Sequence, residues 1–121
     1  MFLLVIVLPE EKQISKLLTK FVEIDVRGAT IINSYGMGEL LSRDIPVFSS
    51  LRSLLSGENS QINNHTVFSV IRTEETLQKA IETIKNFIDF SKPNSGIMFT
   101  LPLLNTYGLA EPLQSGAQND R

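Results

Sequence analysis

The 121-residue chain contains no cysteine and no tryptophan, only one histidine, and no excess of basic residues. The absence of cysteine excludes disulfide bonds, zinc-thiolate sites and cysteine nucleophiles. A single histidine, His65, excludes the usual histidine-rich metal cluster. Lysine and arginine number 11 against 13 aspartate and glutamate residues. The resulting net charge of −2 lacks the basic patch that nucleic-acid binding requires, so we expect no nucleic-acid partner.

Long hydrophobic runs are also missing. The longest apolar run, residues 2–8, ends at Pro9 and is far shorter than the roughly 20 residues of a membrane span. No basic segment precedes it, so it does not resemble a signal peptide, and we expect a cytoplasmic protein. Because its apolar residues do not alternate with polar ones, the run predicts a strand in the centre of a sheet.

The remaining pattern predicts one domain with two helices and three further strands. A helix of about four turns is expected to begin at Pro9, with Glu10 and Glu11 in its first turn. The second helix is expected from Thr73, a good N-cap, to Ile88. Strands are expected at 29–35, 66–71 and 97–101. The two apolar helical stripes are Ile14, Leu17, Leu18, Phe21 and Val22, and Leu77, Ala80, Ile81, Ile84 and Ile88.

This β-α-β-β-α-β order predicts the α+β class and a ferredoxin-like sandwich, with a four-stranded antiparallel sheet and both helices on one face. Residues 2–8 are apolar at both parities, so the second face of the sheet also needs cover. We expect an oligomer to cover it. The alternative is that the long connection between the second and third strands folds back over this face.

That connection, residues 36–64, is long enough to be functional. Within it, residues 48–57 predict a short amphipathic helix, which either packs on its own subunit or a neighbour, or docks on a partner protein or membrane surface. The compact domain is expected to span residues 1–104. Residues 105–121 form a C-terminal extension that is expected to be frayed at its end.

Three segments resemble the PII signalling family and its PII-like relatives. The segment from Gly28 to Gly38 resembles the family's second strand and its glycine-aromatic-glycine exit into the T-loop, the family's long partner-binding loop. Residues 70–88 resemble the third strand and second helix, and residues 95–99 resemble the glycine turn called the B-loop. The resemblance covers residues 1–104, with residues 36–64 as the T-loop-like insertion.

The resemblance implies a cytoplasmic homotrimer that binds an adenine nucleotide (ATP, ADP or AMP, with cyclic di-AMP as a further candidate) in clefts between subunits. It also implies that the T-loop controls a protein partner, such as a membrane transporter. Glycines suit such a site because backbone N–H groups approach phosphate closely where no Cβ intervenes. The implied site residues are Gly28 and Thr30 near the base, Ile71 beside the adenine, Gly36, Met37 and Gly38 at the base of the T-loop, and Gly96 at the phosphates.

The chain departs from the family where phosphate would be bound. Ile97 follows Gly96 in place of a lysine, and the stretch 103–108 beyond the fourth strand is uncharged where the family has two arginines. The T-loop lacks the family's modifiable tyrosine in a recognisable context and its glutamine for 2-oxoglutarate and magnesium, so nitrogen sensing is not expected. The candidates to replace the missing cations are Arg27, Arg43, Arg72 and Lys92.

An alternative function is a trimeric metal-binding or scaffold protein of the CutA kind that binds no nucleotide. Enzymatic activity is not expected, because no nucleophile with a base within reach is evident. The carboxylate pairs Glu10–Glu11 and Glu74–Glu75 lie at expected helix starts, where the helix dipole explains them.

Overall fold

The computed structural model of the protein describes residues 1–37 and 63–109, and these contain four strands and two helices. The order of the elements is the predicted β-α-β-β-α-β. The expected helix at 48–57 and the candidate residues Gly38 and Arg43 lie outside the described residues. The elements are β1 (Phe2–Leu8), α1 (Glu11–Glu23), β2 (Thr30–Tyr35), β3 (Asn63–Ile71), α4 (Glu74–Lys85) and β4 (Ile97–Pro102).

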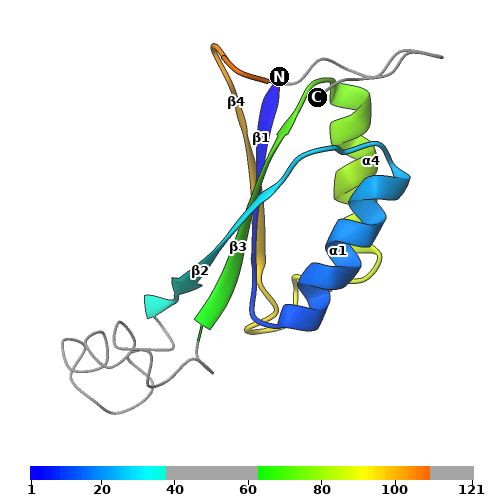
Figure 1. The fold of residues 1–121 in the computed structure, drawn as a ribbon. Helices are drawn as coiled ribbons and strands as arrows, with labels where there is room; N and C mark the ends of the chain where they lie inside the picture. The colour runs from blue at the N-terminus through cyan, green and yellow to red at the C-terminus, as the bar shows by residue number, and fades with distance from the viewer. Residues whose placement is uncertain (38–62, 110–121) are drawn as a thin grey trace.

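The four strands form one antiparallel sheet in the order β2-β3-β1-β4. Strand β1 has a neighbour on each side, as its uninterrupted apolar run predicted. Both helices pack on the same face of this sheet (Figure 1). The ferredoxin-like fold is therefore confirmed. Neither helix in the described ranges is long and apolar enough to cross a membrane.

Several element boundaries differ from those predicted. Strand β3 begins at Asn63, three residues earlier than expected, because these residues pair with β2 as far as Tyr35. Strand β4 includes Pro102, and β4 lies at the edge of the sheet, where a missing N–H is tolerated. Helix α1 begins after Glu10 rather than at Pro9, and the Glu10 N–H donates to Gln13 Oε1 at 3.3 Å. Helix α4 ends at Lys85, three residues before the expected end.

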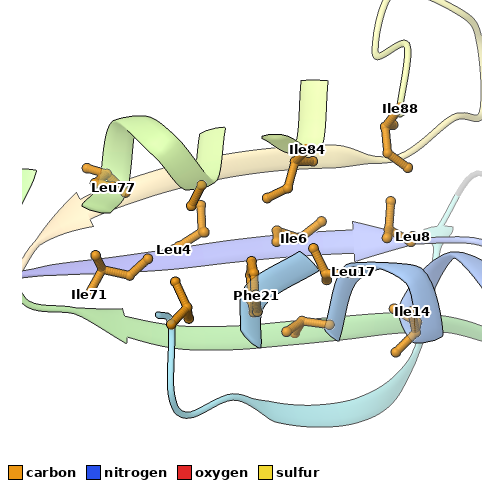
Figure 2. Packing of buried hydrophobic residues seen from close by; sticks show 13 residues of the cluster. Leu4, Ile6, Leu8, Ile14, Leu17, Phe21, Ile71, Leu77, Ile84 and Ile88 are labelled. Carbon is orange, nitrogen blue, oxygen red and sulfur yellow. The ribbon is translucent and has the colours of Figure 1, made fainter. Parts of the chain in front are cut away.

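The hydrophobic core lies between the helices and the face of the sheet that they cover (Figure 2). It uses alternate residues of β1, since side chains two apart share a face. Both helical stripes supply the second layer of this core. The main contributors are Leu4, Ile6 and Leu8 from β1, Ile14, Leu17 and Phe21 from α1, and Leu77, Ala80 and Ile84 from α4.

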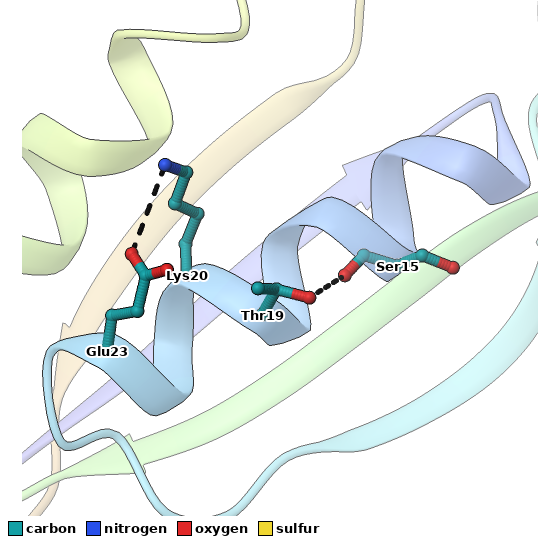
Figure 3. Close-up of polar contacts among 4 residues, drawn as sticks. All are labelled: Ser15, Thr19, Lys20 and Glu23. Atoms are coloured by element: carbon teal, nitrogen blue, oxygen red, sulfur yellow. Dashed lines mark hydrogen bonds and ion pairs between the residues drawn. The ribbon is translucent and has the colours of Figure 1, made fainter.

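One member of the predicted stripe on α1 is exposed. Val22 is 77% exposed, because it follows the buried Phe21 by one residue and is therefore turned about 100° round the helix. Polar contacts on α1 include the Thr19 Oγ1 hydroxyl, which donates to the Ser15 carbonyl at 3.0 Å (Figure 3). The Lys20 ammonium lies 4.0 Å from the Glu23 carboxylate.

The other face of the sheet is apolar, and the described residues leave its β4 side chains exposed, although Val5 of β1 is buried. The odd-numbered side chains of β1 lie on this face, outside the helix-side core, and they pair with apolar residues of β4. Ile97 is 54% exposed, and Phe99 and Leu101 are each 44% exposed. The pairs on this open face are Val7 with Ile97, Val5 with Phe99, and Leu3 with Leu101.

Candidate functional site

A groove of about 680 Å³ lies at the end of the sheet where β1 begins and β3 ends. Its walls are the turn between α1 and β2, the last residues of β3, the start of α4, and a short segment that follows β4. Residues from all four parts line it: Asp25, Val26, Arg27, Gly28, Ala29, Thr30, Phe68, Ser69, Val70, Ile71, Arg72, Thr73, Thr76, Gly108 and Leu109.

A partly buried hydrogen bond holds the β2 side of the groove against β3. The Ser69 Oγ donates to the Gly28 carbonyl oxygen at 2.6 Å, and Ser69 is only 3% exposed. A Cβ atom added at Gly28 would meet no atom within 4 Å. The protein itself therefore leaves space for a side chain at Gly28, and a glycine there keeps the groove wide.

The start of α4 forms the opposite wall. Thr73 caps this helix as predicted, because its Oγ1 accepts a hydrogen bond from the Thr76 N–H at 3.2 Å. The Thr73 hydroxyl also lies 3.1 Å from the Thr76 hydroxyl, to which it donates. The cap places Arg72, the residue directly before it, on the groove.

The groove has three charged residues, Asp25, Arg27 and Arg72. Arg27 Nη2 lies 2.7 Å from Asp25 Oδ1, so the two side chains form a hydrogen-bonded ion pair. Asp25 has a φ of 69°, in the left-handed region that aspartate tolerates better than most residues. Because the side chains of Arg27 and Asp25 are 44% and 73% exposed, water screens their attraction.

The structure brings three of the predicted site residues together. Gly28, Thr30 and Ile71 all line the groove, although β2 and β3 are separated by the long connection in the sequence. Of the candidate cations, Arg27 and Arg72 line it as well. Lys92 is exposed in the turn between α4 and β4 and does not line the groove.

Three other predicted residues lie at the opposite end of the sheet. Gly36 and Met37 follow the end of β2, and Met37 is 73% exposed. Gly96 precedes Ile97, which pairs with Val7, whereas Ile71 pairs with Phe2. Phe2 and Val7 are five positions apart on β1, a distance of about 17 Å in an antiparallel strand. Within one chain, the predicted residues therefore form two separate groups.

Gly96 has a structural reason to be glycine. Its φ is 123°, and a Cβ atom there would lie 2.6 Å from the Val7 carbonyl oxygen and 3.0 Å from Leu8 Cδ2. The backbone of this turn thus packs directly against β1. The fold alone requires glycine at this position, whether or not a phosphate is bound nearby.

The loop between α4 and β4 also contains a carboxylate with a shifted pKa. Hydrogen bonds from the Ser91 side chain and backbone N–H lower the pKa of Asp89 below its ordinary value of 3.8. The Ser91 Oγ donates to Asp89 Oδ1 at 2.6 Å, and the Ser91 N–H donates to it at 3.1 Å. These bonds order the loop, and they lie outside the groove.

Sequence reasoning missed the groove's last wall. Gly108 and Leu109 line the groove, although they lie beyond the predicted domain limit at residue 104. The Leu103 N–H donates to the Met1 carbonyl at 3.0 Å, and Thr106 Oγ1 donates to Met1 Sδ at 3.3 Å. These contacts bring the segment after β4 beside the start of β1. No sequence pattern predicts such contacts between the first and last parts of the domain.

Comparison with known proteins identifies the fold. No family model matches the chain, and no curated protein matches it in sequence. Among solved structures, it is similar to a proposed PII-like signalling protein from Thermus thermophilus, with a TM-score of 0.55 and 15% sequence identity. The match covers 83% of this chain and 82% of that one. The chain has a PII-like fold. The resemblance found in the sequence is thus confirmed at the level of the fold.

Metal binding requires a group of side chains that could hold the ion. Among residues 1–37 and 63–109, no three histidine, aspartate or glutamate side chains are grouped so that they could hold a metal ion.

Proposed function

We propose that the chain is a PII-like regulatory protein, and not an enzyme, that binds an adenine nucleotide between subunits of a homotrimer. Nucleotide binding changes how residues 36–64 fit a protein partner, for which a membrane transporter is a candidate. The observation that supports this most strongly is that the predicted site residues lie at two ends of one sheet, so that one chain alone does not bring them together.

A complete nucleotide site needs both groups of residues. In one chain, Ile71 of the groove lies about 17 Å along the sheet from Ile97, the residue after Gly96. A second copy can present its own Gly36, Met37 and Gly96 end to the groove of the first copy. The cleft between two subunits then contains all of the described residues that the resemblance implies.

The open face of the sheet supports the assembly. Its pairs of apolar residues on β1 and β4 include three side chains that are 44% to 54% exposed. Large contiguous apolar patches are uncommon on monomers, and a second copy of the chain would remove this one from water. The same contact would hold the two halves of the nucleotide site in a constant relation.

The test is a calorimetric titration of the purified protein with ATP, ADP, AMP and cyclic di-AMP, combined with its mass from light scattering in the same buffers. We expect a trimer that binds at least one of these nucleotides. A trimer that binds none would favour the scaffold function, and a monomer that binds a nucleotide would contradict the site between subunits.

The regulatory step needs a second measurement. A ligand shifts a loop between states only if it binds one of them better, so nucleotide binding should alter the reactivity of residues 36–64. We expect bound nucleotide to change the rate at which a protease cleaves after Arg43 or Arg52, measured by mass spectrometry. An unchanged rate at saturating nucleotide would contradict control through this segment.

A further inference from the structure

The groove is positively charged on a protein of opposite net charge. Arg27 and Arg72 line it against one carboxylate, Asp25, which leaves a formal charge of +1, whereas the chain as a whole carries −2. Glu74 and Glu75 in the first turn of α4 are exposed and do not line the groove. The groove is therefore suited to an anion.

Two of the groove's hydroxyl groups already donate to the protein. Ser69 donates to the Gly28 carbonyl, and Thr73 donates to the Thr76 hydroxyl. Each hydroxyl has a single proton, so neither group can donate to a ligand without breaking its present bond. The two guanidinium groups are thus the strongest donors that the groove side chains offer to an anion.

The ion pair between Arg27 and Asp25 does not prevent Arg27 from contacting a ligand. It joins Arg27 Nη2 to Asp25 Oδ1, whereas a guanidinium has five N–H donors in a planar fork. Both side chains are more than two-fifths exposed, so the pair is screened by water and weakly held. Arg27 can therefore contact a ligand anion, but the Asp25 carboxylate beside it opposes the approach of negative charge.

We propose that Arg27 and Arg72 bind a phosphate group of the ligand in the groove, and that Asp25 weakens this binding by offsetting the charge of Arg27. The proposal rests on the proposed function in taking the ligand to be a nucleotide. The cations thus come from the turn between α1 and β2 and from the junction between β3 and α4. They replace charges that are absent from the chain after Gly96 and from residues 103–108.

The test measures the affinity of four single variants for AMP and ATP by calorimetry: Arg27→Gln, Arg72→Gln, Arg72→Lys and Asp25→Asn. Lys79→Gln is the matched control, because Lys79 is an exposed cation on α4 that does not line the groove. Circular dichroism confirms that each variant is folded, and Arg72→Lys keeps the charge at position 72 if the glutamine variant does not fold. In parallel, inorganic phosphate is titrated while the arginine side-chain N–H signals are followed by NMR.

We expect Arg27→Gln and Arg72→Gln each to weaken AMP binding about tenfold, the loss typical of one hydrogen bond to a charged group. Asp25→Asn should strengthen it about threefold, since it removes one screened negative charge. Arg72→Lys should lose less than Arg72→Gln, and Lys79→Gln should change affinity less than twofold.

The outcomes separate this inference from the proposed function. If the wild-type protein binds a nucleotide and both glutamine variants behave like Lys79→Gln, the inference is wrong and the proposed function stands. If no nucleotide binds but phosphate shifts arginine signals that are absent from the variants, the anion site stands and the proposed function is wrong. If neither nucleotide nor phosphate binds, both are wrong.

Discussion

At one end of the sheet Gly28 borders an open groove, whereas at the other end Gly96 packs against the backbone of β1. A side chain at Gly28 would contact nothing in the protein, but a side chain at Gly96 would collide with the Val7 carbonyl. The two glycines belong to the same predicted site, and the sequence alone does not distinguish their roles. Their surroundings show that a glycine can keep space for a ligand or can be required by packing alone.

The largest effect is expected from Phe99→Asp, which tests whether the two ends meet between chains. Phe99 lies on the open apolar face, where assembly would bury an unpaired charge at a cost of several kcal/mol. We expect the trimer to become monomeric in light scattering and nucleotide binding to be lost with it.

Thr100→Asp is the matched control for this change, because Thr100 is the next residue of β4, is exposed, and points to the other face of the sheet. It should leave the mass unchanged. A monomeric Phe99→Asp variant that still binds nucleotide would show that the groove end suffices without the Gly96 end.

A smaller effect, on stability, is expected from Gly96→Ala. The new Cβ would lie 2.6 Å from the Val7 carbonyl oxygen in a backbone with a φ of 123°, and such crowding and strain cost about 3 kcal/mol. Urea denaturation should show this loss in the free energy of unfolding. Equal stability of the Gly96→Ala and Gly28→Ala variants would contradict the claim that packing requires glycine at position 96 but not at position 28.

The smallest effect is expected from Gly28→Ala, and it falls on binding rather than on stability. Because no atom lies within 4 Å of the added Cβ, the free energy of unfolding should change by less than about 0.5 kcal/mol. The methyl group narrows the groove where the ligand is expected, so nucleotide affinity should fall about tenfold. Calorimetry checks this, and an unchanged affinity would show that the ligand does not approach Gly28.

The fold was largely predictable because its elements follow from local patterns. The apolar run of β1, the helical stripes and the Thr73 cap each lie within a few turns or one strand, and each is found where expected. The misplaced features are those that depend on neighbours. Val22 matched the stripe but lies on its flank, and β3 is longer than expected because β2 pairs with its first residues.

The candidate site was predicted only in part. Gly28, Thr30 and Ile71 came from the resemblance, and the structure brings them together in one groove. Asp25 and Ser69 were missed, because their roles depend on an ion pair in a turn and on a hydrogen bond between distant strands. Such contacts have no periodicity or spacing in the sequence that could indicate them.

The amino-acid sequence by itself determined the order of the elements, the central position of β1 and the absence of cysteine chemistry, since these depend on composition and on periodicity along the chain. Only the tertiary structure decided which residues share the groove and which lie at the other end of the sheet. The physical reason is that strand pairing places residues by register across the sheet. Register pairs Thr30 with Phe68 at the groove and Ile97 with Val7 near the other end, whatever their distance in sequence.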